Sequence, residues 1–348
     1  MATDRPDSRD SPDSALSGGS STGGGTAGAA TPAVEVFLAD FHDRCPGGTP
    51  RAFAPLAVLD AAGHPHASSY HALQAALLAA LGSGDLPDGP LLDLACGDGH
   101  LLALLLPLGR PLVGADLSAG ELAAAAARLA ALGIPRAGLD GQTAELSTMP
   151  SALGSALDAT HDTEPPAVTL YQARAQALPL ADASVAAITC HMALMLMNDP
   201  AQVVAELGRV LRPGGRLLAV LPHVDAQGST AQPLLQAWQA ALRPEARDAG
   251  WQQVRFENRA WGDDQGLAAL LRPAFTPLLL TPLTARQRLS PSQAWDWFAG
   301  MYDLHLLPAA AWPAVRARFM AQLPALQGDD GCVPLQFNYL LLDATAAA

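Results

Sequence analysis

The sequence contains no lysine: its 20 lysine-plus-arginine positions are all arginines. A phosphate-binding P-loop and the protein-kinase signature each need a lysine. Schiff-base and pyridoxal-phosphate chemistry need a lysine amine. The usual forms of these reactions are therefore excluded, as is a reductase that uses a tyrosine–lysine pair.

Cysteines and long apolar runs are also scarce. The four cysteines lie far apart and form no C-x-x-C pair, so no structural metal site is expected. No apolar run reaches the roughly 18 residues that a membrane-spanning helix needs, and the charged N-terminus lacks the apolar segment of a secretory signal. We therefore expect no membrane span and a cytoplasmic location.

The chain is acidic: its formal net charge is −13, and its arginines are scattered along the sequence. Proteins that bind nucleic acids gain much of their affinity from basic patches that neutralise phosphates. A small-molecule partner is therefore expected in place of a nucleic acid. The sequence carries no signal for the oligomeric state.

Four regions follow one another along the chain. Residues 1–33 have almost no large apolar side chain, which predicts a disordered tail. Residues 34–89 predict an N-terminal helical cap, with helices over 34–41 and 70–81. Residues 90–222 predict a cofactor-binding core, and residues 223–348 a C-terminal part with helical material between two strands.

The core alternates apolar strands with helices. Strands are predicted at 90–95, 111–115, 168–172, 185–190 and 216–221, and helices at 100–106, 118–132 and 200–211. Ser118 is the expected N-cap of the second helix and forms a capping box with Glu121. Such alternation predicts an α/β fold with a doubly wound parallel sheet, in which ligands bind beyond the carboxyl ends of the strands.

The C-terminal part supplies two more strands, over 275–283 and 333–342. Pro277 and Pro282 limit the first of these to an edge or an irregular strand. Helices are predicted over 266–271 and over 290–323, where Ser290 and Pro291 mark a helix start.

The turn after the first core strand reads Asp93-Leu-Ala-Cys-Gly-Asp-Gly99. Gly97 and Gly99 permit a tight turn and a close approach of the backbone to a ligand. Asp116 ends the next strand, 116 − 93 = 23 residues further on. An acid about 20 residues after such a turn is placed to bind the hydroxyls of a ribose.

Three segments together resemble class I S-adenosylmethionine-dependent methyltransferases, in particular the type 11 group. They are the Asp93–Gly99 turn, the stretch Ala177-Leu-Pro-Leu-Ala-Asp-Ala-Ser-Val185, and Leu211-Arg-Pro-Gly-Gly-Arg-Leu-Leu218. They cover about residues 90–222. The resemblance implies a Rossmann-like seven-stranded sheet of order 3-2-1-4-5-7-6 and S-adenosyl-L-methionine as the cofactor.

The resemblance also implies roles for residues. Asp93, Gly97 and Gly99 would line the methionine end of the cofactor, Asp116 would bind the ribose, and Leu117 would pack on the adenine. The family usually has an aspartate in the loop after the third core strand, where this chain has Arg174. The backbone of Ala175 and the side chain of Gln176 are the substitutes available there. Ala95 replaces the usual first glycine, a change that we expect to be tolerated.

Catalytic and substrate residues are less strongly indicated. His191 and Met192 follow the fourth core strand, where this fold brings cofactor and substrate together. His191 is the candidate general base, because its ordinary pKa suits neutral pH; a packing role is the competing interpretation. Met192 is a candidate for the substrate pocket.

The segment 290–305 is rich in aromatic residues in a chain with only 5% of them. Trp297 and Tyr302 are the candidates for a lid that shapes the substrate pocket, and packing of helices on the sheet is the alternative. His223, Asp303 and His305 are weaker catalytic candidates.

The interpretation is thus a methyltransferase that acts on an unidentified, small-molecule nucleophile without a metal. A nicotinamide oxidoreductase is less consistent, because position 102 is leucine where the dinucleotide motif has its third glycine. A non-catalytic cofactor-binding regulator and an RNA-base methyltransferase stay open as alternatives.

Overall fold

The computed structural model describes residues 33–134, 166–223, 233–246, 261 and 264–347, which belong to one compact unit. Most of the predicted tail, 1–33, lies outside these residues, as do residues 135–165. The strands are β1 (Val58–Asp60), β2 (Pro65–His66), β3 (Leu91–Leu94), β4 (Leu112–Asp116), β5 (Val168–Gln172), β6 (Val185–His191), β7 (Leu211–Pro222), β8 (Phe275–Leu289) and β9 (Val333–Ala346).

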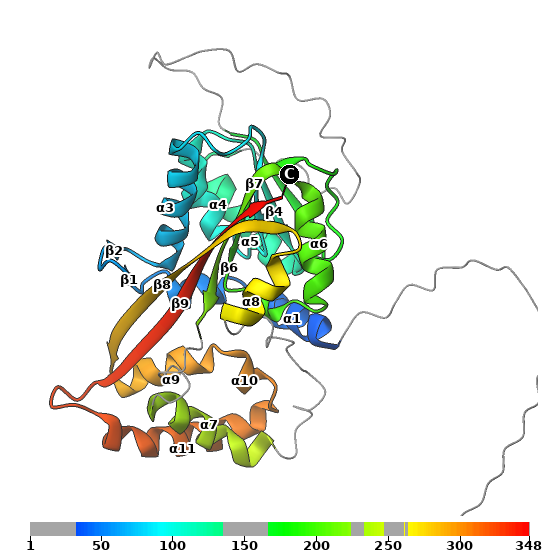
Figure 1. Ribbon diagram of the computed structural model, residues 1–348. Helices are drawn as coiled ribbons and strands as arrows, with labels where there is room; N and C mark the ends of the chain where they lie inside the picture. Colours follow the sequence, from blue (N-terminus) through cyan, green and yellow to red (C-terminus); the bar gives the residue numbers. More distant parts are fainter. Residues whose placement is uncertain (1–32, 135–165, 224–232, 247–260, 262–263, 348) are drawn as a thin grey trace, which may run out of the picture. The chain divides into compact units, whose positions relative to one another are not determined.

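These strands form one sheet with the order β2-β1-β8-β9-β7-β6-β3-β4-β5 (Figure 1). The five strands β5-β4-β3-β6-β7 run parallel, and β9, β8 and the β1–β2 hairpin continue the sheet in antiparallel fashion. The fold is therefore α/β and Rossmann-like. The carboxyl ends of β3, β4, β5 and β6 meet at one edge of the sheet, where a ligand site is expected.

The expectation of seven strands needs a correction, because the described sheet has nine. The two extra strands come from residues 58–60 and 65–66, inside the segment predicted to be a helical cap. They are short and lack the alternation of apolar and polar residues that marks a half-buried strand. As a result β8 is an inner strand, whereas its prolines suggested an edge. Pro277 lies in the irregular stretch between Phe275 and Leu278, where it costs no ladder hydrogen bond.

The helices are α1 (Ala33–Arg44), α2 (Gly48–Phe53), α3 (Ser69–Gly82), α4 (His100–Leu105), α5 (Ala119–Ala131), α6 (Pro200–Val210), α7 (Pro233–Ala246), α8 (Asp264–Leu271), α9 (Pro291–Ala299), α10 (Tyr302–His305) and α11 (Trp312–Gln322). The apolar sides of α3, α4 and α5 pack on one face of the sheet, and those of α6 and α8 on the other. Neighbouring residues of β3 pack on opposite faces of the sheet. Leu91 packs with α3, α4 and α5, and Leu92 packs with α6 and α8. None of the helices in the described ranges has the length and apolarity to cross a membrane.

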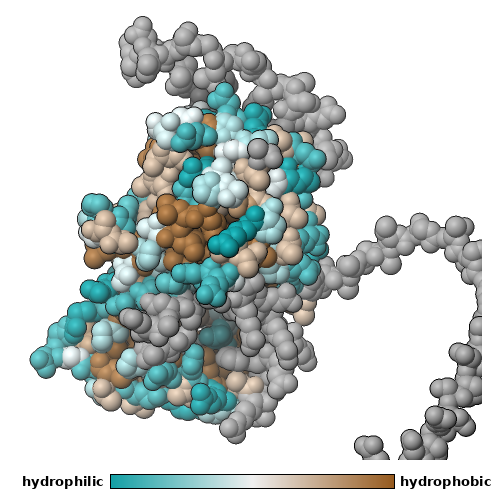
Figure 2. All heavy atoms as spheres, in the orientation of Figure 1, coloured by the Kyte–Doolittle hydropathy of each residue, from teal (hydrophilic) through white to brown (hydrophobic). Residues whose placement is uncertain are grey.

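A third apolar core lies among α7, α9, α10 and α11, at the far ends of the long strands β8 and β9 (Figure 1). Trp238, Phe298 and Phe319 are almost completely buried in it. The exposed face over β8 and β9 carries apolar side chains, among them Leu279, which is 60% exposed (Figure 2).

The two predicted helix starts differ in detail. At α9 the capping box is complete: Ser290 accepts from the backbone of Gln293, whose side chain accepts from the backbone of Ser290. At α5, Ser118 accepts from the backbone of Glu121, but the carboxylate of Glu121 does not reach back to Ser118. The Glu121 carboxylate instead contacts His42 of α1, so the predicted capping box is only half formed.

Candidate functional site

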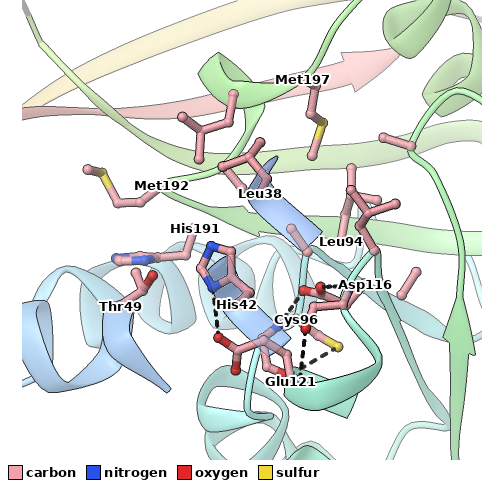
Figure 3. Close-up of a pocket in the computed structure, with 18 of the residues that line it drawn as sticks. Leu38, His42, Thr49, Leu94, Cys96, Asp116, Glu121, His191, Met192 and Met197 are labelled. Carbon is pink, nitrogen blue, oxygen red and sulfur yellow. Dashed lines mark hydrogen bonds and ion pairs between the residues drawn. The ribbon is translucent and has the colours of Figure 1, made fainter. Parts of the chain in front are cut away.

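A pocket opens at the carboxyl ends of β3, β4, β5 and β6. Its walls are the turn after β3, the β4–α5 connection, the loops after β5 and β6, and side chains of α1. The helices α2 and α4 contribute two residues each, and α3 and α10 one each. Figure 3 shows α1 crossing this pocket with Leu38 and His42 directed into it, while Asp116 and His191 lie on either side. The pocket thus stands where the fold predicts a ligand.

The carboxyl group of Asp93 lines the pocket and is buried. Its side chain is only 2% exposed, and its Oδ1 accepts a hydrogen bond of 2.9 Å from the Thr189 hydroxyl. Its Oδ2 is buried, and no group among the described residues hydrogen-bonds to it. Burial raises the pKa of this carboxyl from 3.8 to about 8, against the opposing effect of Thr189. A buried carboxylate with a missing partner is the group that a ligand cation would satisfy.

The turn after β3 has left-handed backbone at Ala95, Gly97 and Gly99. Gly97 lines the pocket, and its N–H donates to Asp116 over 2.9 Å. Gly99 does not line the pocket. A side chain there would meet the Cβ of Ala125 at 3.1 Å, so glycine is needed for α5 to pack closely. At Ala95 the φ of 55° is strained for an alanine, a cost that the sequence did not reveal.

Asp116 ends β4 and lies in the same pocket as Asp93. Its Oδ1 accepts from the Ser118 N–H over 2.8 Å, and its Oδ2 accepts from Gly97. Burial raises the pKa of this carboxyl, and the two backbone donors oppose the rise. Leu117 lines the pocket next to it. The 23-residue spacing therefore brings both predicted acids into one site.

The loop after β5 carries Arg174, Ala175 and Gln176 into the pocket. Arg174 donates two hydrogen bonds, of 2.6 and 2.9 Å, to the carboxylate of Glu35 on α1. The Gln176 amide donates to the same carboxylate over 3.1 Å and to the Asn198 carbonyl over 2.7 Å. Sequence reasoning missed Glu35, because nothing in the pattern of α1 connects it with this loop. The unexplained arginine at position 174 was the one available signal.

A second polar cluster joins α1 to the rest of the pocket. The His42 ring lies 2.9 Å from the Glu121 carboxylate through Nδ1 and 2.8 Å from the Tyr302 hydroxyl through Nε2. Glu121 also accepts from the Gly47 N–H over 2.8 Å. Tyr302, predicted as a pocket residue, does line the pocket, and burial raises its pKa. His42 and Glu121 had no functional assignment in the sequence, since their meeting depends on the tertiary fold.

Comparisons with known proteins bear on these residues. A family model for the methyltransferase domain matches residues 131–219, which begin after the Asp93–Gly99 turn and Asp116. The ubiquinone/menaquinone biosynthesis C-methyltransferase UbiE of Acidiphilium cryptum is 35% identical over 108 residues. That match covers 29% of this chain and 43% of the relative, so the chain spans less than half of the relative's length.

Part of the chain is thus similar to methyltransferases.

Solved structures with similar folds are more distant. A methyltransferase-like protein from Bacillus halodurans has a TM-score of 0.46 and 16% identity, over 79% of this chain and 99% of that one. The [4+2]-cyclase SpnF has a TM-score of 0.48 and 16% identity, over 91% of this chain and 97% of that one. The methyltransferase-domain match supports S-adenosylmethionine as the cofactor.

His191, the candidate base, lies at the end of β6 and lines the pocket. Its ring stacks on Tyr70 with centroids 3.6 Å apart, and its Nε2 is 2.8 Å from the Ser69 hydroxyl. Burial lowers its pKa to about 3, so the ring is neutral and a weak proton acceptor. Its Nδ1 is buried and has no hydrogen-bond partner within the described part of the chain. This geometry favours a hydrogen-bonding role over that of a general base.

The other predicted residues fall into two groups. Met192 lines the pocket beside His191 (Figure 3). Trp297 does not: it packs on Phe337 and Phe298, with centroids at 4.6 and 4.9 Å. The weaker candidates also lie outside the pocket lining; they are His223, Asp303 and His305. In the described part of the chain, no cluster of histidine, cysteine and acidic side chains is arranged to hold a metal ion.

Proposed function

We propose that this chain is an S-adenosylmethionine-dependent methyltransferase whose substrate is a small molecule. The observation that carries the proposal is the buried Asp93 carboxylate with an unpartnered Oδ2, in one pocket with Asp116. A cofactor with a free ammonium group supplies the partner that Asp93 lacks. A ribose with two hydroxyls suits the remaining acceptor capacity of Asp116.

The charge of the pocket supports the same cofactor. Four carboxyl groups line it, those of Glu35, Asp93, Asp116 and Glu121, together with one guanidinium group, that of Arg174. S-adenosylmethionine carries a sulfonium and an ammonium against one carboxylate, so an acidic pocket suits its net positive charge. The bound cofactor supplies an electrophilic methyl group.

The residues of the chain would then hold and orient the reactants. Asp93, Gly97 and Asp116 would bind the amino-acid and ribose parts of the cofactor, with Leu117, Ala175 and Gln176 around the adenine. The α1 helix and Tyr302 cover the pocket and exclude water, which strengthens the electrostatic interactions inside it.

Beside His191 the pocket wall is largely apolar, with Leu38, Met192, Leu196 and Met197. The polar groups there are Thr49 and the Nδ1 of His191, for which no described residue is a hydrogen-bond partner (Figure 3). Such a wall suits a small apolar substrate with one polar group, which the neutral imidazole would orient. The similarity to a C-methyltransferase of quinone biosynthesis supports a small-molecule substrate, and the net charge of −13 disfavours a nucleic acid.

We further propose a division of labour along the chain. Residues 34–89 cover the pocket, residues 90–222 form the cofactor-binding core, and residues 223–348 complete the sheet and bring Tyr302 to the site.

The test has two stages. Calorimetric titration with S-adenosylmethionine should show binding to the purified chain. Incubation with cofactor labelled in the methyl group and with the small-molecule fraction of a cell extract should then label a compound. Binding without any labelled product would favour a non-catalytic regulator, and absence of binding would refute the proposal.

A further inference from the structure

The Glu35 carboxylate is an acid brought into the pocket by a helix outside the cofactor-binding core. Glu35 lies in the first turn of α1 and is 5% exposed. Arg174 binds it through two hydrogen bonds, and Gln176 adds a third. The loop Ala173-Arg-Ala-Gln176 has no acidic residue of its own. The carboxylate at this end of the pocket therefore comes from α1.

The position of Glu35 separates it from the other pocket acids. Its partners stand after β5, which lies two strands away from β3 in the sheet. At about 4.8 Å between strands, this places them roughly 10 Å from the Asp93 end. A cofactor whose amino-acid part meets Asp93 and whose ribose meets Asp116 must extend its base in this direction.

The carboxylate has capacity left for a ligand. Each of its oxygens can accept two hydrogen bonds. Among the described residues, Oε1 accepts from Arg174 and Gln176, whereas Oε2 accepts only from the Nε of Arg174. Glu35 lines the pocket. One acceptor position on Oε2 is thus available beside a pocket.

We infer that Glu35 accepts a hydrogen bond from the exocyclic amino group of the cofactor's adenine and so determines the choice of nucleobase. Arg174 and Gln176 are positioning residues that hold the carboxylate. This assignment rests on the proposed function. It also accounts for the arginine at position 174, which holds the buried carboxylate in place through two hydrogen bonds.

The experiment compares two ligands that differ at one group. S-adenosylhomocysteine carries the amino group, and S-inosylhomocysteine carries a carbonyl oxygen in its place. A carboxylate accepts from the first and repels the second. The wild-type chain should bind S-adenosylhomocysteine about tenfold or more tightly, the usual effect of a hydrogen bond to a charged group. Equal affinities in calorimetry would overturn the assignment without any variant.

Two variants separate nucleobase recognition from a structural ion pair. Glu35→Gln should abolish most of the preference, because its amide can donate to the carbonyl of the inosine analogue. The double variant Glu35→Arg/Arg174→Glu exchanges the two partners, so that the acid stands at position 174. This variant should again prefer the ligand with the amino group. Asp40→Asn is the matched control: Asp40 is an exposed acid of α1 that pairs with Arg44, and its loss should leave the preference unchanged.

The outcomes are distinct. If Glu35→Gln lowers the melting temperature and weakens both ligands equally, Glu35 is a structural residue and the inference is wrong. If the wild-type chain binds neither ligand, the proposed function itself fails.

Discussion

At the scale of single residues, Asp93 predicts a pH dependence of cofactor binding. Its pKa of about 8 means that the free protein holds a proton on this carboxyl at neutral pH. An ammonium group beside the carboxylate would lower that pKa, so binding would release the proton. Affinity for S-adenosylhomocysteine should therefore rise from pH 6 to pH 8, by at most about tenfold per pH unit, and then level off.

The control for this prediction is Asp93→Asn, which cannot ionise and should remove the Asp93-dependent rise. Calorimetry in buffers of different ionisation enthalpy measures the released proton. The same raised pKa has the opposite effect on stability: the folded chain binds this proton more tightly than the unfolded chain, so the contribution of Asp93 falls as pH rises from about 4 to about 8. A wild-type affinity that is flat over this range would contradict the role of Asp93.

Ala95 predicts a stabilising substitution at the turn after β3. Its φ of 55° lies in the left-handed region, which disfavours alanine. Ala95→Gly relieves this strain, and the added freedom of the unfolded chain offsets part of the gain. We expect the free energy of unfolding to increase by up to about 1 kcal/mol, as measured by denaturant titration.

The same substitution elsewhere provides the control for this turn. Ala123 is exposed within α5, and Ala123→Gly should destabilise the chain by about 1 kcal/mol. Equal destabilisation by both substitutions would show that the turn carries no strain.

At the scale of elements, the helices α7, α9, α10 and α11 combine two roles. Most of their aromatic residues form a core of their own, and Tyr302 alone among the predicted aromatic candidates reaches the pocket. Phe319 is fully buried in this core. Phe319→Ala should lower the free energy of unfolding by about 3–5 kcal/mol. The affinity of the folded chain for the cofactor should stay unchanged, because Phe319 does not line the pocket.

Tyr302→Phe is the informative partner of this substitution. It removes only the hydroxyl that meets His42, so its effect should fall on ligand affinity more than on stability. Thermal melting and calorimetry on both variants measure the two quantities. A loss of cofactor affinity by folded Phe319→Ala, with unchanged melting, would contradict this division.

The elements also show what the sequence could predict. The central strands and the helices α3–α6 could be predicted to within one residue at each end, because apolar periodicity and glycine or proline punctuation mark their ends. The exception is β7, which begins at Leu211, five residues before the predicted start. The β1–β2 hairpin could not, since two- and three-residue strands carry no periodic signal. The contact of the Glu121 carboxylate with His42 could not be predicted either, because it depends on the tertiary fold and replaces the local capping interaction.

At the scale of the whole molecule, the predicted site residues meet because the sheet aligns the ends of its parallel strands. Asp93, Asp116 and His191 are separated in sequence but end adjacent or nearby strands. The contribution of α1 was beyond sequence reasoning. Glu35 and His42 reach the pocket only through the way this helix packs across it, and the ion pair with Arg174 joins residues 139 positions apart.

The most direct test of the account is calorimetric titration of S-adenosylmethionine into the wild-type chain and into Asp116→Ala. We expect binding by the wild type and an affinity at least about tenfold lower in the folded variant, because charge-assisted hydrogen bonds to the ribose are lost. A folded wild-type chain that does not bind the cofactor, or a variant that binds it equally well, would contradict it.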